Sequence, residues 1–99
     1  MANEPSLSLK RAVWPNERVL SIEFADGEFG LFDTRSDTEY RLNVTASHIW
    51  ECLKQGIGLP EIGRRLACEF GIDGDVASRS LIDCIEQLLR LELVEASDL

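Results

Sequence analysis

The first half of the chain alternates apolar and polar residues. Leu20, Ile22 and Phe24 occupy every second position, which is the period of a strand with one buried face. Asp26-Gly27 follows, and this pair favours a two-residue hairpin turn because both of its positions need positive φ. We therefore predict a β-hairpin with its apolar residues on one face. The apolar pairs expected across its ladder are Phe24 with Phe29 and Ile22 with Leu31.

A third strand should run from Glu39 to Leu42, with Tyr40 and Leu42 on the same face. Asn43 directly after it suits a helix N-cap, because its side chain can accept from the first unpaired backbone N–H groups. The apolar positions that follow have the i, i+3, i+4, i+7 spacing of an amphipathic helix. They are Ala46, Ile49, Trp50 and Leu53. This helix should stop at Gly56-Ile57-Gly58.

Two further helices are predicted after this stop. Pro60 suits the first turn of one helix, and Gly71 suits its end. The segment Asp73–Asp75 can cap the other helix, which should run to about Arg90. The stripes expected to face the core are Leu59, Ile62, Leu66 and Phe70 in the first of them, and Ala77, Leu81, Cys84, Ile85 and Leu88 in the second.

Ile82 and Leu89 are surplus to the core stripe of the last helix. They are seven positions apart and lie roughly 100° round from the centre of that stripe. Either the helix is wedged between two partners inside the fold, or it carries a second apolar strip on its outer side.

The chain is long enough for one domain and too short for a second core. Of its 99 residues, we expect 1–9 to form a flexible arm, 10–94 to form the domain and 95–99 to fray. No apolar run approaches the length of a membrane span, and the N-terminal segment lacks the basic flank and hydrophobic stretch of a signal peptide. These features predict a cytoplasmic protein that does not bind a membrane.

The charge makes nucleic acid an unfavourable partner. The chain has 18 acidic and 10 basic residues, a net charge of −8, and that field would repel a polyanion. The basic pair Arg64-Arg65 is too small to reverse it. We therefore predict that the protein does not bind DNA or RNA.

The residues that could carry chemistry form no recognisable catalytic or metal site. Cys52, Cys68 and Cys84 are odd in number and lack metal-clip spacing, so we expect buried or half-buried free thiols. His48 and Cys52 are four residues apart, but two ligands do not complete a metal site. No nucleophile with a base and no glycine-rich phosphate loop is recognisable. We therefore predict neither catalysis nor a cofactor.

The joint between the third strand and the first helix carries the combination Tyr40-x-Leu42-Asn43-x-Thr45-Ala46-x-x-Ile49-Trp50. Further segments in the same order are Leu59-Pro60-Glu61-Ile62, Leu66-Ala67-x-x-Phe70 and Leu88-Leu89-x-x-x-Leu93-Val94. Together, over about residues 18–94, these segments resemble the PqqD-like family, the RiPP recognition elements. Two positions depart from the family pattern: Ser80, where Asp is frequent, and Glu92, where Gly is usual.

The resemblance implies an α+β, winged-helix-like fold in which a three-stranded antiparallel sheet is followed by a three-helix bundle. It also implies a protein that binds the leader segment of a ribosomally synthesised precursor peptide without catalysing a reaction. Such a protein presents the leader to a separate maturation enzyme, for example a radical SAM enzyme or a leader peptidase.

The third strand offers a physical route to peptide binding. One of its sides should pair with the second strand, so the other side is an open edge that can accept an added strand. From the resemblance, and from the surplus Ile82 and Leu89, we expect the last helix to form the opposite wall of a groove. Core packing explains Tyr40 and Leu42 individually at least as well. The candidate peptide-binding residues are Glu39, Tyr40, Arg41, Leu42, Ile82, Glu86, Leu89 and Arg90.

Two other classes of function stay open at this stage. A winged-helix-like transcriptional regulator or regulator accessory would share the layout, although here the hairpin precedes the helices. An assembly subunit would use the open edge to form a homodimer. Neighbouring genes for a short precursor and a modifying enzyme would favour peptide binding, whereas retention on DNA would favour the regulator.

Overall fold

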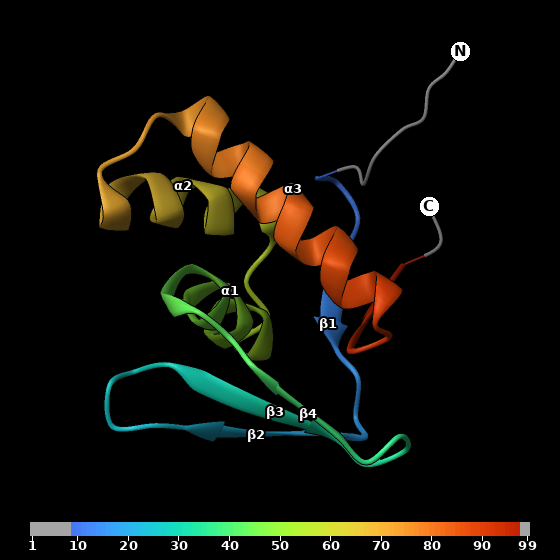
Figure 1. The fold of residues 1–99 in the computed structure, drawn as a ribbon. Coiled ribbons are helices and arrows are strands. Elements are labelled where there is room, and N and C mark those ends of the chain that lie inside the picture. Colours follow the sequence, from blue (N-terminus) through green and yellow to red (C-terminus); the bar gives the residue numbers. More distant parts are fainter. Residues whose placement is uncertain (1–8, 98–99) are drawn as a thin grey trace.

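The computed structural model describes residues 9–97 of the chain. Figure 1 shows a small sheet on one side of the molecule, with the three helices gathered on the other side. The three-stranded sheet has the order β2-β3-β4, and β1 pairs separately with β5. In chain order the elements are β1 (Val13–Pro15), β2 (Val19–Glu23), β3 (Phe29–Asp33), β4 (Thr38–Arg41), α1 (Val44–Lys54), α2 (Leu59–Phe70), α3 (Gly74–Arg90) and β5 (Val94–Ala96). The predicted α+β fold, with an antiparallel sheet followed by three helices, is confirmed.

Two polar side chains hold the joint between β4 and α1. Asn43 caps α1 as predicted, its side chain accepting a hydrogen bond from the Ala46 N–H at 2.8 Å. The buried Ser47 hydroxyl accepts from the Phe29 N–H at 2.8 Å and donates to the Leu42 carbonyl at 3.3 Å. This hydroxyl ties the first turn of α1 to β3 and to the end of β4. It thereby fixes the helix over the inner face of the sheet (Figure 1).

The hairpin between β2 and β3 is confirmed, but the register that we predicted for it is wrong by one residue. Ile22 lies opposite Gly30 instead of Leu31. The loop has three residues rather than two, because the Phe24 N–H donates to the Glu28 carbonyl at 2.8 Å. Gly27 has a φ of +89°, the left-handed conformation that a three-residue hairpin loop requires at its last position.

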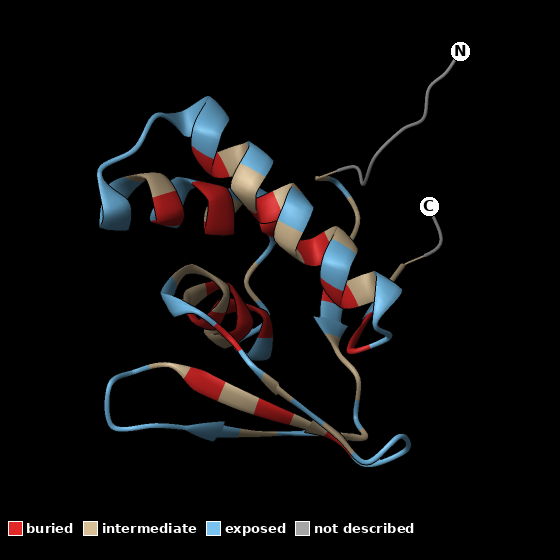
Figure 2. Cartoon of the chain, in the orientation of Figure 1, coloured by how far each residue is buried: buried red, intermediate tan, exposed pale blue. Residues whose placement is uncertain are grey.

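This one-residue shift moves every side chain of β2 to the opposite face of the sheet. Leu20, Ile22 and Phe24, which we predicted to face the core, are 58%, 64% and 38% exposed on the outer face. The inner face is supplied mainly by β3, where Phe29 and Leu31 are buried. Figure 2 shows the alternation along β3 as successive buried and half-buried segments.

A second small sheet joins the two ends of the described chain. Trp14 of β1 lies opposite Glu95 of β5, and the Ser97 N–H donates to the Ala12 carbonyl at 2.9 Å. Residues 95–97 are therefore part of the fold, contrary to our expectation that 95–99 would fray, and residues 98–99 lie outside the described range. The expected arm, residues 1–9, also lies outside it except for Leu9, which packs against the core.

The three helices supply most of the core that the sequence predicts, and their boundaries agree closely with the expected caps. Two predicted positions are wrong. Phe70, at the last turn of α2, is 36% exposed, and its ring lies edge-on to His48 with centroids 5.9 Å apart. Cys68 is exposed, whereas Cys52 is buried and Cys84 is half-buried. Among residues 9–97, no helix combines the length and apolar character needed to cross a bilayer.

The C-terminal end of α3 closes in a turn that favours glycine. The Leu93 N–H donates to the Leu88 carbonyl and the Glu92 N–H to the Leu89 carbonyl, each at 2.9 Å, which is the bond pair of a Schellman cap. Glu92 has the left-handed φ of +63° that this cap requires. Its side chain forms an ion pair with Arg35. The turn therefore closes with Glu at a position where the resemblance leads one to expect Gly.

The Glu92→Gly variant is expected to unfold at a higher urea concentration than the wild type, with a gain of up to about 1 kcal/mol. A residue with a Cβ costs roughly 1–2 kcal/mol at left-handed φ, whereas an exposed ion pair contributes about 0–1 kcal/mol. The control Glu92→Ala keeps the backbone strain and loses the ion pair, so it should be no more stable than the wild type. A glycine variant less stable than Glu92→Ala would contradict this explanation.

A buried ion pair fastens the sheet to the same turn. Asp33 is 3% exposed, and its carboxylate accepts from Arg18 twice, from Nε at 2.9 Å and from Nη2 at 3.2 Å. Arg18 also donates to the Glu92 carbonyl at 2.9 Å. The hydrogen bonds from Arg18, supported by the backbone N–H of Arg35, lower the pKa of Asp33 to about 2.

This pair predicts a loss of stability in acid. The pKa of an Asp carboxyl in the unfolded chain is about 3.9, whereas the pKa of Asp33 in the folded protein is about 2. The stabilisation is therefore complete above about pH 4 and is lost as the pH falls through about 2. Thermal unfolding of wild type and Asp33→Asn should show a difference in Tm that is widest above about pH 4 and closes towards pH 2. A difference that stays constant across this range would contradict the assignment.

Candidate functional site: the β4 edge and the groove beside α3

β4 forms an edge of the sheet. In the part of the chain that the structure describes, β4 has a strand partner on one side only. The Leu42 N–H, just beyond its end, donates to the Phe29 carbonyl at 2.9 Å. Because bonded and non-bonded residues alternate along an antiparallel pair, Glu39 and Arg41 must direct their backbone N–H and C=O groups away from β3. These four groups are placed to pair with an added strand.

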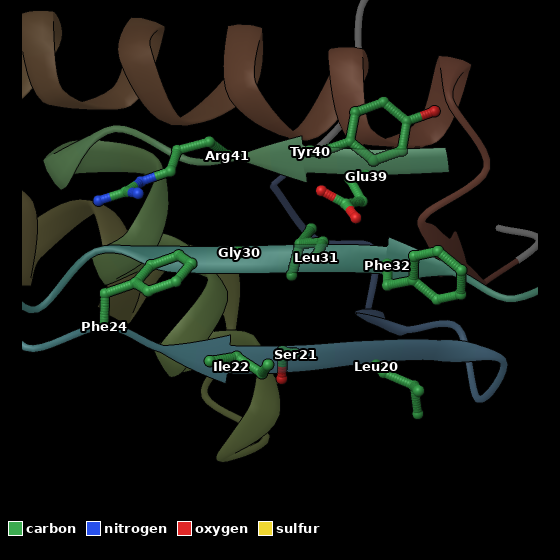
Figure 3. Close-up of a pocket in the computed structure, with 10 residues that line it drawn as sticks. All are labelled: Leu20, Ser21, Ile22, Phe24, Gly30, Leu31, Phe32, Glu39, Tyr40 and Arg41. Atoms are coloured by element: carbon green, nitrogen blue, oxygen red, sulfur yellow. The ribbon is translucent and has the colours of Figure 1, made fainter. Parts of the chain in front are cut away.

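A groove with a volume of about 230 Å³ lies between this edge and α3. Figure 3 shows α3 passing along the side of β4 that faces away from β3. The sheet and the joint contribute one wall, and α3 with the turn after it contributes the other. The lining residues are Tyr40, Arg41, Leu42, Asn43 and Ala46 on the first wall and Cys84, Gln87, Leu88, Leu91 and Leu93 on the second.

The groove offers apolar contact rather than reactive groups. Leu42, Leu88 and Leu93 belong to the buried core, so they give the groove a preformed floor, whereas Leu91 is 37% exposed at its rim. Burial raises the pKa of the Cys84 thiol to about 11, so the thiol stays protonated at neutral pH and is a poor nucleophile. Within residues 9–97, no group of three or more His, Cys, Asp or Glu side chains could hold a metal ion.

The residues that we predicted from the third strand lie at this site. Tyr40, Arg41 and Leu42 line the groove. Glu39 presents its backbone to the open edge, while its side chain lies on the outer face of the sheet (Figure 3). The structure thus brings the four predicted positions of this strand together at one edge.

The structure does not bring the residues that we predicted from α3 to the groove. Ile82, Glu86, Leu89 and Arg90 are not part of its lining. At about 100° per residue, Ile82 and Leu89 lie roughly 160° round the helix from the positions that face the groove. Both pack against the core, which favours the internal explanation of these surplus residues.

From the sequence we did not predict that Gln87 of α3 and Leu91 just after it face the groove, and we assigned Cys84 and Leu88 to the core stripe only. Cys84, Gln87, Leu88 and Leu91 follow one another at the i, i+3, i+4, i+7 spacing of a single helix flank. This spacing was the available signal. Because Cys84 and Leu88 also fit the core stripe of the helix, the sequence did not distinguish this flank from the core.

Arg41 is already engaged on the outer face. Its Nη2 lies 3.2 Å from carboxylate oxygens of both Asp26 and Glu28, and its guanidinium carbon lies 4.1 Å from the centroid of the Phe24 ring. Because this charge is already matched, we expect the Arg41 backbone, rather than its side chain, to recognise a peptide strand.

The outer face of the sheet also has an open apolar hollow, with a volume of about 840 Å³ (Figure 3). Leu20, Ile22, Phe24 and Phe32 gather around Gly30. Phe24 covers this glycine so closely that a Cβ added to it would lie 2.9 Å from the ring. We did not predict this face from the sequence, because a two-residue turn would direct the apolar side of β2 to the core.

Two solved structures have the same fold. The structure described as TbiB1 in complex with the TbiA(beta) leader peptide superposes with a TM-score of 0.79 at 28% sequence identity, covering 83% of this chain and 94% of that chain. The structure described as lasso peptide synthetase B1 complexed with the leader peptide superposes with a TM-score of 0.77 at 20% identity, covering 85% of this chain and 98% of that chain. The fold is therefore that of a RiPP recognition element.

The sequence agrees with this assignment. Residues 28–94 match the family described as coenzyme PQQ synthesis protein D (PqqD). The chain belongs to the PqqD family, which confirms the resemblance seen in the sequence. No curated protein matches the chain. Neither the family nor the two structures support the transcriptional-regulator alternative.

Proposed function

We propose that this protein binds the leader segment of a ribosomally synthesised precursor peptide by adding it as a strand to the free edge of β4. The observation that carries the proposal is that this open edge lies directly beside an apolar groove. A strand that pairs with Glu39 and Arg41 would place alternate side chains over the groove between β4 and α3. The leader complexes named for the two similar structures support this kind of ligand.

The energetics require both the edge and the groove. Up to four backbone hydrogen bonds at the β4 edge would contribute roughly 2–6 kcal/mol. Association and ordering of the peptide cost about 4–15 kcal/mol, so the edge alone cannot give a micromolar complex. Apolar burial contributes about 25 cal/mol per Å². The groove therefore has to supply the remaining affinity, and Ala46, Leu88 and Leu91 are the residues placed to do so.

We propose a binding role without catalysis, in the cytoplasm, with the modification carried out by a separate enzyme such as a radical SAM protein or a leader peptidase. The protonated thiol of Cys84 and the apolar lining of the groove suit a surface that holds a peptide. The net charge of −8 disfavours nucleic acid as an alternative ligand.

The direct test is a titration of the full chain into a fluorescein-labelled peptide. The peptide is the N-terminal segment of a short open reading frame identified by sequencing the region that flanks this chain's gene. We expect a saturable rise in anisotropy with a Kd of about 1 μM or tighter, equivalent to about −8 kcal/mol. A scrambled peptide of the same composition is the control. Equal affinity for both peptides, or no saturable binding, would contradict the proposal.

A further inference from the structure

The outer face of the sheet carries apolar residues that no other part of the described chain covers. Leu20 and Ile22 are 58% and 64% exposed, and with Phe24 and Phe32 they surround the hollow over Gly30. The helices lie on the opposite side of the sheet (Figure 1). Apolar residues gathered on one exposed face, unlike scattered ones, indicate an interaction surface.

This face is continuous with the leader-binding edge. Tyr40 and Arg41 line both the outer hollow and the groove. A strand added to β4 would widen the sheet by about 4.8 Å and would direct half of its side chains to the outer face. A protein seated on this face would therefore contact the bound leader as well.

The size and charge of the face argue against a second copy of this chain as its occupant. Three strands of four or five residues span about 14 Å by about 17 Å. Two such faces would bury about 500 Å², whereas stable dimers bury about 1,200 Å² or more. Glu39, Asp26 and Glu28 also leave the face and its rim more acidic than the single Arg41 can balance. Two acidic copies would repel each other.

A transient partner that is also held to the complex by the precursor peptide suits this surface better. We infer that the outer face of the sheet, at Leu20, Ile22, Phe24 and Phe32, docks the peptide-modifying enzyme through an apolar patch flanked by lysine or arginine. This inference rests on the proposed function. The precursor supplies the second link, because its leader lies on β4 while its remaining segment enters the enzyme. A small contact is then sufficient, since the link raises the effective concentration of the two proteins.

The test uses three charged variants of the full chain, all at exposed apolar residues. Ile22→Glu places a carboxylate in the outer face. Leu91→Glu does so in the groove. Val76→Glu is the matched control, since Val76 is 46% exposed in the first turn of α3, away from both surfaces. Circular dichroism melting establishes that each variant folds.

Each variant is titrated against the labelled leader, and separately, with saturating precursor peptide present, against a purified modifying enzyme encoded beside this chain's gene. We expect Ile22→Glu to weaken enzyme binding by about tenfold or more while leader affinity stays within about twofold. Val76→Glu should match the wild type in both titrations. Wild-type enzyme binding should weaken as salt is raised, because the docking charges are exposed.

Three results would overturn the inference. The first is that Ile22→Glu leaves enzyme binding unchanged. The second is that Val76→Glu loses as much enzyme affinity as Ile22→Glu. The third is that the wild type forms a dimer in sedimentation analysis and Ile22→Glu dissociates it. The last result would assign the face to a second copy. Failure of the proposed function is separate, because it would appear as absent leader binding in the wild type.

Discussion

The Leu91→Glu variant is expected to bind the leader peptide about thirtyfold more weakly than the wild type. Leu91 stands at the rim of the groove, 37% exposed, so a glutamate there is hydrated in the free protein and must lose water when the peptide covers it. Covering a charged group without a hydrogen-bonding partner costs about 2 kcal/mol or more, which is about thirtyfold in Kd. Anisotropy titration of the labelled leader measures the change.

The same measurement separates the groove, at the C-terminal end of α3, from the N-terminal end of that helix, where Val76 lies. Val76→Glu tests whether any added charge on the helix lowers affinity, and we expect its Kd to lie within about twofold of the wild type. Ile82, which the sequence suggested as a groove residue, packs against the core instead. If Leu91→Glu binds as tightly as Val76→Glu, the groove does not hold the leader.

The second large effect is expected from proline on the open edge. In Glu39→Pro, the missing N–H is one that points away from β3, so no bond within the sheet is lost. Proline is tolerated at such outward positions of an edge strand. It removes a donor for the added strand, and its ring obstructs the approach of that strand. We expect leader affinity to fall by about tenfold or more, while the unfolding temperature changes by only a few degrees.

Two controls isolate the backbone effect. Glu39→Ala removes the same side chain and keeps the N–H, so it should bind the leader nearly as well as the wild type. Tyr40→Pro removes an N–H that points into the β3–β4 ladder, so it should lower the unfolding temperature markedly. Full leader affinity in a folded Glu39→Pro protein would contradict strand addition at this edge.

Local chemistry made the helices and the joint predictable. Asn43 could be recognised as a cap because a short acceptor side chain preceded a helical apolar stripe. Gly71, at φ +62°, could be recognised as a helix end for the same local reason. The order of the elements predicted a third strand at the edge of the sheet, and β4 occupies that edge.

The faces of the sheet and of α3 could not be derived from local patterns. Asp26-Gly27 fits both a two-residue and a three-residue hairpin loop, and the difference of one residue decides whether Ile22 faces the core or the solvent. Around α3, the two flanks of the core stripe are equivalent in the sequence. Only the packing of α3 against α2 and β5 decides that Leu91 lines the groove beside β4 and Leu89 does not.

The most direct measurement of strand addition is amide hydrogen exchange of the full chain with and without the leader peptide. Glu39 and Arg41 carry the outward N–H groups of β4, and Ser21 and Glu23 carry those of β2, the other edge of the sheet. The leader should slow exchange at Glu39 and Arg41 by about tenfold or more and leave Ser21 and Glu23 unchanged. Protection confined to the β2 edge, or no protection at either edge with the leader bound, would contradict peptide binding at β4.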